Sequence, residues 1–228
     1  MIYSERIGKN PYPNIERFNT LWNERRITTP LVIMVGGYAG VGKSTLAYAV
    51  GKQVNNISFY ATGFARAAAQ TFIAPDENAA LYKSTFSLHE LTYGEVDERK
   101  IVELFKRQRD PVTKILVRSI NFVAEEHQHT IIDGNHVSPD LSAEISRNNP
   151  GIIPIEVYLS VTDPETHRKM MEGPTHSRKI SDVDFETARI LHDFIVSEAR
   201  ENEKSVLEYS AGIRGTLVMI DKRLEEIV

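Results

Sequence analysis

Short apolar runs alternate along the chain with longer segments in which apolar residues recur every three or four positions. The run LVIMV at 31–35 does not alternate with polar residues, which is typical of a strand buried on both faces of a parallel sheet. Four later runs are interpreted as further strands: residues 57–61, 130–134, 152–161 and 216–220. Because these strands alternate with helical patterns, the sequence predicts a doubly wound α/β fold around a five-stranded parallel sheet flanked by helices.

The helices are predicted from apolar residues at helical spacing. The expected helices cover residues 14–26, 44–54, 62–72, 99–108, 111–128, 163–173 and 184–208, and a short one follows 220. Pro111 favours the first turn of a helix, so it is expected to begin a helix separate from the one before it.

The chain is expected to form one domain over residues 1–228, with three additions. The polar residues 1–30 are expected to form a peripheral extension. The weakly helical region at about 74–110 is the candidate for an inserted cap. Residues at about 172–183 are expected to form a mobile lid, because glycine and proline follow Met171 and permit hinge motion.

Composition narrows the possible partners. The chain has 228 residues, 41% of them hydrophobic, and 27 Lys and Arg against 31 Asp and Glu give a net charge of −4. This balance does not favour nucleic acid as a partner. There are no cysteines, which excludes disulfides and thiolate metal sites. The N-terminus does not resemble a signal peptide and no apolar stretch reaches membrane-spanning length, so a cytoplasmic protein without a membrane partner is expected.

The segment GGYAGVGKST at 36–45 lies between the first strand and the following helix and fits the pattern G-x-x-x-x-G-K-[ST]. Its glycines allow successive N–H groups to converge on one anion, and the helix dipole adds to that site. The chemistry predicts that Lys43 reaches the β and γ phosphates of ATP and that Ser44 holds Mg²⁺. The residues expected to bind the nucleotide are Gly37, Ala39, Gly40, Val41, Gly42, Lys43, Ser44 and Thr45.

Other positions separate the possible phosphate-binding functions. A GTPase would show D-x-x-G and N-K-x-D elements, and neither occurs. Asp133 ends the third strand in TIIDGNH, where it would face the phosphate site. It is a candidate Mg²⁺ ligand and a candidate base for the acceptor hydroxyl, and the sequence leaves both roles open. A single acidic residue at this strand end resembles the arrangement in small-metabolite and nucleotide kinases.

With these motifs in place, the chain resembles the archaeal 2-phosphoglycerate kinase family from about residue 31 to about residue 220. The matching stretches are GGYAGVGKST, LYKSTF, IIDGNHVSP, DPETHRKM and FETARILHDFIVSEARE. The resemblance implies a P-loop fold of the nucleoside-monophosphate-kinase type, with ATP and Mg²⁺ as cofactors. It also implies a small phosphorylated hydroxy acid as the substrate.

The chain departs from the family pattern at Gly63, where an aspartate is expected, although Arg66 is retained. A relative of the family phosphorylates mevalonate 3-phosphate at its 5-hydroxyl, a step of isoprenoid synthesis. That acceptor is preferred here because Gly63 leaves more room and removes a negative charge. The alternative is 2-phosphoglycerate, which would give 2,3-bisphosphoglycerate.

An acceptor with phosphate and carboxylate groups needs cations and hydrogen-bond donors beside the γ-phosphate. The candidate substrate residues are Arg66, Phe64, Lys83, Ser84 and His136. Arg178, in the expected lid, is the candidate for stabilising the transition state, and Lys43 and Asp133 complete the catalytic set.

Two further readings are kept. One is a kinase of nucleic-acid 5′ ends or of sugar nucleotides, and the acidic net charge disfavours long polyanionic strands as its substrate. The other is a non-catalytic ATP sensor, to which Gly63 gives some support. The sequence does not specify the acceptor, the choice between ATP and GTP, or the oligomeric state.

Overall fold

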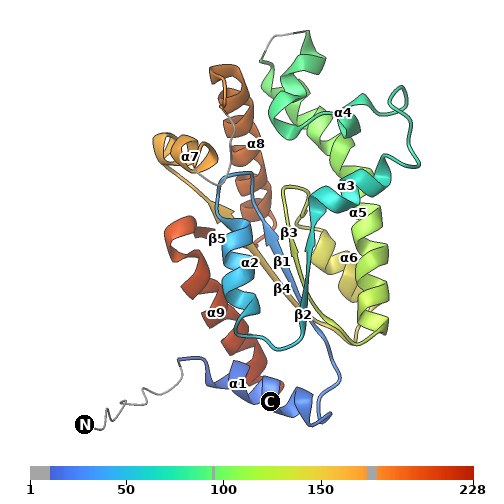
Figure 1. The fold of residues 1–228 in the computed structure, drawn as a ribbon, viewed down its shortest axis with the longest axis vertical. Coiled ribbons are helices and arrows are strands. Elements are labelled where there is room, and N and C mark those ends of the chain that lie inside the picture. The colour runs from blue at the N-terminus through green and yellow to red at the C-terminus, as the bar shows by residue number, and fades with distance from the viewer. Residues whose placement is uncertain (1–10, 94–95, 174–178) are drawn as a thin grey trace.

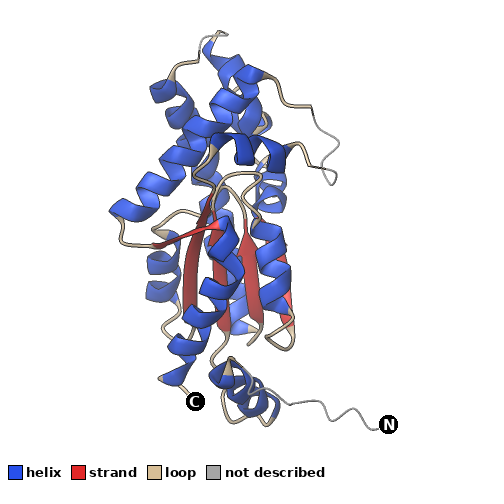
Figure 2. Ribbon diagram, turned by 90° about the vertical axis from the view of Figure 1, so that its left-hand side faces the viewer, coloured by secondary structure: helices blue, strands red, loops and turns tan. Residues whose placement is uncertain are grey.

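The computed structural model describes residues 11–93, 96–173 and 179–228. Its centre is a parallel sheet of five strands in the order β2-β3-β1-β4-β5 (Figure 1). The strands are β1 (Leu31–Gly36), β2 (Ile57–Ala61), β3 (His129–Asp133), β4 (Ile153–Ser160) and β5 (Ser205–Glu208). The predicted parallel sheet is therefore confirmed, and its helices cover both faces (Figure 2).

Ten helical segments surround the sheet in the described part of the chain. They are α1 (Pro13–Asn23), α2 (Lys43–Gly51), α3 (Thr62–Ala69), α4 (Ala79–Tyr82), the 3-10 helix η1 (Thr85–Thr92), α5 (Glu98–Glu125), α6 (Leu141–Asn148), α7 (Pro164–Met171), α8 (Asp182–Glu201) and α9 (Tyr209–Glu225). None of them is long and apolar enough to cross a bilayer.

The central strand β1 explains why the core has two halves. Val32 and Met34 pack into the cluster that includes side chains of α5 and α8. Ile33 and Val35 pack into the opposite cluster, with side chains of α2 and α9. Successive side chains of a strand point to opposite faces, so a strand between two helical layers must be apolar at every position.

The fifth strand is not where the sequence analysis placed it. Residues 216–220 lie inside α9, where Leu217, Ile220 and Leu224 are buried at helical spacing while Val218 is half exposed. The strand is instead Ser205–Glu208, which pairs only with the last four residues of β4. The helix predicted over 184–208 accordingly ends at Glu201.

Helix α5 is continuous, which contradicts the prediction of two helices separated at Pro111. Proline has no N–H, so the carbonyl of Arg107, four residues earlier, loses its helical donor. The side chain of Asn78 replaces that donor, because its Nδ2 lies 2.9 Å from the Arg107 oxygen. A tertiary hydrogen bond thus satisfies the group that the proline leaves unpaired.

The region at 74–110 contains α4, η1 and the first half of α5. These elements stand beyond the carboxyl ends of the strands, next to the upper part of α8 (Figure 1). At the opposite end of the sheet, α1 packs beside α9, and the Asp221 carboxylate accepts the backbone N–H groups of Asn14 and Ile15 at 2.8 and 3.0 Å. These contacts hold α1 against the domain.

At Pro111, the side chain of Asn78 replaces the missing helical N–H donor, and this replacement gives a testable prediction. Asn78→Asp keeps an acceptor for the Leu81 N–H at the start of α4 but removes the donor to Arg107. We expect a loss of about 1 kcal/mol in the free energy of unfolding, measured with urea. In a Pro111→Ala background the helical N–H returns, so the same substitution should cost clearly less. Equal losses in both backgrounds would contradict this account.

Candidate active site

The glycine-rich turn between β1 and α2 takes a backbone path that only glycine follows without strain. Gly37, Gly40 and Gly42 have φ values of 130°, 79° and 87°. A Cβ on Gly40 would also lie 2.3 Å from Cγ of Met171. Because Gly42 directly precedes the first residue of α2, the turn ends at a helix N-terminus, which favours anions.

A cavity of about 1000 Å³ opens over this turn. Its lining residues come from the turn and α2 (Ala39, Gly40, Gly42, Lys43, Ser44, Thr45), from η1 (Phe86), from the loop after β3 (Asn135) and from α7 and its end (Thr166, Lys169, Met170, Met171, Gly173). Six of the eight predicted nucleotide residues therefore line one cavity. Of the other two, Val41 is fully buried with its side chain in the core. Gly37 directly follows the last residue of β1 and is not one of the lining residues.

Lys43 is buried, and no carboxylate in the described part of the chain forms a salt bridge with it. Its Nζ donates to the backbone oxygen of Tyr38 at 2.5 Å and to Oδ1 of Asn135 at 3.1 Å. Burial lowers the pKa of Lys43 to about 8, and the nearby negative charge of Asp133 opposes this shift. An ammonium has three N–H bonds, so one donor remains for a ligand in the cavity.

Ser44 and Asp133 meet at the carboxyl end of the sheet. The Ser44 Oγ donates to Oδ2 of Asp133 at 2.8 Å. Hydroxyl and carboxylate oxygens suit Mg²⁺, which uses few protein ligands and completes its shell with waters and phosphates. Among the described residues, no group of three or more acidic, histidine or cysteine side chains is arranged to hold a metal ion, as a dedicated metal cage would need. The pair fits a Mg²⁺ ion that arrives with a nucleotide.

The turn is tied to α7 and α8 by His167, which the sequence analysis did not single out. Its Nε2 lies 2.8 Å from the oxygen of Ala39, and its Nδ1 lies 3.2 Å from Nη1 of Arg189. Both partners fix the tautomer, because a carbonyl can only accept and a guanidinium can only donate. The neutral ring therefore donates from Nε2 and directs the Ala39 carbonyl toward α7.

Arg66 is the predicted substrate residue whose surroundings best suit an anion. Its Nη1 donates to the backbone oxygen of Lys83 at 2.7 Å, and burial lowers its pKa. No acidic side chain forms a salt bridge with it in the described chain. A half-buried guanidinium without an anionic partner has a high affinity for an anionic ligand.

None of the predicted substrate residues, Arg66 included, is among the residues that line the large cavity. Lys83 forms an ion pair with Glu90 at 2.5 Å. Ser84 caps η1 by accepting from the Phe86 N–H and lines a smaller cavity of about 280 Å³ beside Phe86 and Lys179. The structure does not place either side chain in the large cavity.

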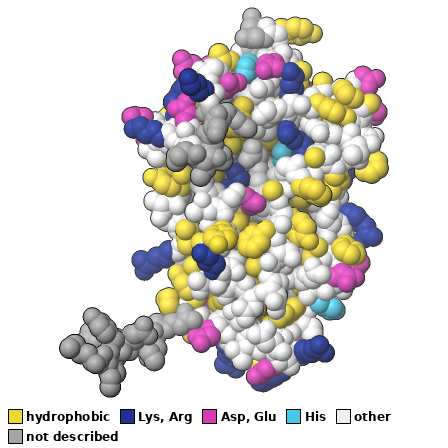
Figure 3. Space-filling view, viewed as in Figure 1, with side chains coloured by type: hydrophobic (Ala, Val, Ile, Leu, Met, Phe, Trp, Pro, Cys, Tyr) yellow, Lys and Arg dark blue, Asp and Glu magenta, His cyan; other side chains and the backbone are white. Residues whose placement is uncertain are grey.

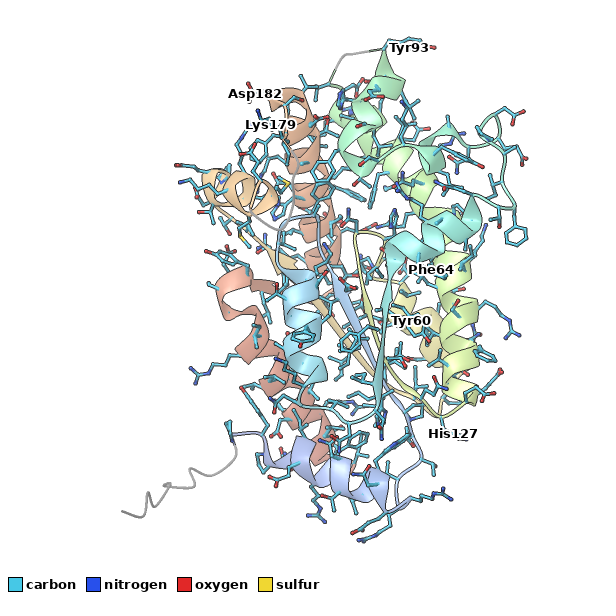
Figure 4. All side chains as sticks on the ribbon, viewed as in Figure 1. Tyr60, Phe64, Tyr93, His127, Lys179 and Asp182 are labelled. Atoms are coloured by element: carbon cyan, nitrogen blue, oxygen red, sulfur yellow. The ribbon has the colours of Figure 1, made fainter. Side chains whose placement is uncertain are left out.

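Phe64 is 77% exposed, on α3. It lies above Tyr60 on the same face of the molecule (Figure 4). That face shows apolar side chains across its middle, over the edge strand β2 and α2 (Figure 3). Phe64 therefore belongs to a surface and not to the lining of the cavity.

His136 lies under the site and not at its surface. It is 4% exposed, and burial, aided by nearby cationic side chains, lowers its pKa to about 3. Its Nδ1 is 3.1 Å from Oγ1 of Thr62 and its Nε2 is 2.9 Å from Oε1 of Gln108. Gln108 in turn donates to the oxygens of Ala80 and Lys83. The prediction that His136 contacts substrate is corrected, because both ring nitrogens are already bonded inside the protein.

Asn135 and Gln108 were missed by the sequence analysis. Asn135 stands two residues after Asp133 in a stretch that was already singled out, so its place beside a strand end was an available signal. Gln108 gave no such signal, because it looks like an ordinary polar position of a helix. Arg178 lies outside the described residues.

Comparison with known proteins identifies similar chains, although no family model matches. A 2-phosphoglycerate kinase of Methanopyrus kandleri is 27% identical over 199 residues, which is 84% of this chain and 60% of that protein. A 2-phosphoglycerate kinase of Methanococcus maripaludis (strain C5) is 28% identical over 209 residues, which is 86% of this chain and 65% of that protein. The chain thus spans about 60 to 65% of the length of these curated relatives. The resemblance drawn from the motifs is confirmed.

Among solved structures, the unliganded crystal structure of a sugar kinase from Janibacter sp. HTCC2649 is similar, with a TM-score of 0.50 and 16% identity. The match covers 86% of this chain and 95% of that one. The predicted fold class, a P-loop α/β fold with a five-stranded parallel sheet flanked by helices, is confirmed.

The buried histidines predict how stability depends on pH. Burial lowers the pKa of His129 and His167 to about 4 and that of His136 to about 3, from an ordinary value of 6.5. The unfolded chain therefore binds more protons between about pH 6.5 and 4, so acid favours unfolding. We expect the free energy of unfolding to fall as pH drops from 7 to 5, by about 2 kcal/mol for His136 alone.

The measurement is urea unfolding at both pH values. His136→Gln should reduce the difference in the free energy of unfolding between the two pH values. A stability that stays constant, or rises, on acidification would contradict the assignment of neutral buried rings.

Proposed function

We propose that the chain is a kinase that transfers the γ-phosphoryl group of ATP to a hydroxyl of a small phosphorylated hydroxy acid, with 2-phosphoglycerate as the preferred acceptor. The observation that carries the proposal is the meeting of three groups at one cavity. These are the glycine-rich turn, the buried Lys43, which has no anionic partner among the described residues, and Ser44, whose hydroxyl is hydrogen-bonded to Asp133.

Each group has a distinct task in phosphoryl transfer, which depends mainly on positioning and electrostatics. The N–H groups of the turn and the start of α2 hold the phosphate oxygens. Lys43 neutralises charge that develops on the transferred group. Ser44 and Asp133 would hold Mg²⁺, which would offset negative charge on the phosphates of a bound nucleotide.

The hydrogen bond between Ser44 and Asp133 helps to choose between the two candidate roles of Asp133, Mg²⁺ ligand and base for the acceptor hydroxyl. Its Oδ2 is directed at the hydroxyl that occupies the Mg²⁺ position of the motif. This bond supports the role of Asp133 as a Mg²⁺ ligand. Its other carboxylate oxygen, Oδ1, stays available to the acceptor hydroxyl. We therefore assign Asp133 first to Mg²⁺ and second to the acceptor hydroxyl.

Arg66 supports an acceptor that carries an anion. Its guanidinium is held by a backbone oxygen, so part of its donor fork is left for a ligand. A phosphate or carboxylate on the acceptor would supply the missing negative charge.

The names of the relatives favour 2-phosphoglycerate over mevalonate 3-phosphate. Mevalonate 3-phosphate remains the second candidate because of Gly63. A Cβ built on Gly63 meets no atom within 4 Å, and this exposed residue is not among those that line the large cavity, so Gly63 supplies open space only beside the described cavity. The same observation means that packing does not require glycine at this position.

An acceptor panel tests the proposal. ADP release is measured with 2-phosphoglycerate, mevalonate 3-phosphate, glycerate and an oligonucleotide with a free 5′-hydroxyl. We expect turnover with a phosphorylated hydroxy acid, and Lys43→Ala should lower it about 1000-fold or more, because the variant loses a charge at the transferred group. Lys52→Ala, on the exposed end of the same helix, is the matched control and should keep full activity.

Binding of ATP without turnover of any acceptor would favour the sensor reading and contradict the proposed function. Turnover of the oligonucleotide alone would favour the nucleic-acid reading.

Arg66→Ala should raise the KM for the acceptor about 10- to 100-fold, because a charge-assisted hydrogen bond is lost, while the KM for ATP changes little. Arg66→Lys should recover part of the loss, since it keeps the charge without the planar fork. Arg118→Ala, an exposed arginine on α5, serves as the control. An unchanged acceptor KM in Arg66→Ala would remove Arg66 from the acceptor site.

A further inference from the structure

The loop that follows β3 lies between the glycine-rich turn and the elements above the sheet. Asn135, in this loop, uses both ends of its side-chain amide. Its Oδ1 accepts from Lys43 at 3.1 Å, and its Nδ2 donates to Oγ1 of Thr85 at 3.2 Å. An ammonium can only donate, so the amide oxygen must face Lys43 and the NH₂ group must face Thr85. The direction of the bridge is therefore fixed by chemistry.

The far end of this bridge is the first residue of η1. Thr85 is 5% exposed, and its neighbour Phe86 lines the large cavity. Phe86 also lines the smaller cavity beside Lys179. A shift of Thr85 would thus move a wall that the two cavities share.

The near end of the bridge is the side chain that a nucleotide would hold. Lys43 has two neutral acceptors, Tyr38 O and Asn135 Oδ1, and no carboxylate partner among the described residues. A triphosphate would take its third N–H and restrict the ammonium to one position. Restricting the ammonium also restricts the amide that accepts from it, and through that amide the hydroxyl of Thr85.

We propose that Asn135 is a positioning residue that couples nucleotide binding at Lys43 to the order of η1, whose Phe86 lines the cavity. The inference rests on the proposed function, because it takes a nucleotide triphosphate as the ligand of Lys43. Coupling of this kind is reciprocal, so an acceptor that orders η1 would also tighten nucleotide binding.

Hydrogen exchange of the full chain tests the coupling without an acceptor. The probe is AMPPNP with Mg²⁺, and the readout is exchange of the backbone amides of residues 85–92. In the wild type, saturating AMPPNP should slow this exchange about 5-fold or more. Thr85→Val removes only the hydroxyl that Asn135 reaches, so it should lose this protection while its Kd for AMPPNP stays within about 2-fold of the wild type.

Three further variants make the result specific. Thr85→Ser keeps the hydroxyl and should restore the protection. Thr92→Val removes another buried hydroxyl from the same helix, one that donates to the backbone oxygen of His89. This variant should keep the exchange protection. Asn135→Leu cuts the bridge at its centre and should lose the protection at saturating AMPPNP, which keeps the inference testable if Thr85→Val does not fold.

The outcomes separate this inference from the proposed function. Protection of residues 85–92 that persists in Thr85→Val and Asn135→Leu would mean that the nucleotide orders η1 by direct contact with Phe86, and it would overturn the role of Asn135. Binding to the wild type without any protection would also overturn it. A wild type that does not bind AMPPNP, measured by calorimetry, would overturn the proposed function and the coupling together.

Discussion

The pairing of β1 with β3 is the constraint on which the whole site depends. In this register Val35 faces Asp133, and the N–H of Gly134 donates to the oxygen of Val35 at 3.1 Å. The glycine-rich turn leaves the sheet one residue after Val35, so the carboxylate reaches the hydroxyl of Ser44 directly. A shift of one residue would point the side chain of Asp133 to the opposite face of the sheet. The apolar side chains on both faces of β1 make such a shift costly.

Around this pair, the site is held together by neutral polar side chains that burial keeps uncharged. His167 holds the Ala39 carbonyl, and His136 connects Thr62 with Gln108. A charged ring at either place would face a guanidinium or lose an accepted hydrogen bond. Lys43 is the exception, a buried cation whose hydrogen-bond partners among the described residues are both neutral. That imbalance supports the proposed triphosphate ligand.

The secondary structure was predicted well where local patterns and tertiary packing agree. Residues 31–35 are apolar at every position because helices cover both faces of the central strand. The prediction failed where the two disagree. Residues 205–208 contain only two apolar side chains, and they form a strand because the end of β4 offers them a partner. Pro111 stays inside α5 because Asn78, distant in sequence, donates to the carbonyl that the proline leaves without a partner.

By itself, the sequence determined the glycine-rich turn, the parallel sheet that carries it and the acid at the end of the third strand. These features follow from local backbone preferences and from the period of apolar residues. Only the tertiary structure decided which polar side chains meet there. It buried His136 instead of exposing it and left Phe64 on the surface. It also placed Asn135 between Lys43 and Thr85. Such contacts join residues far apart in sequence, so their distances depend on how the helices and loops pack and not on any local pattern.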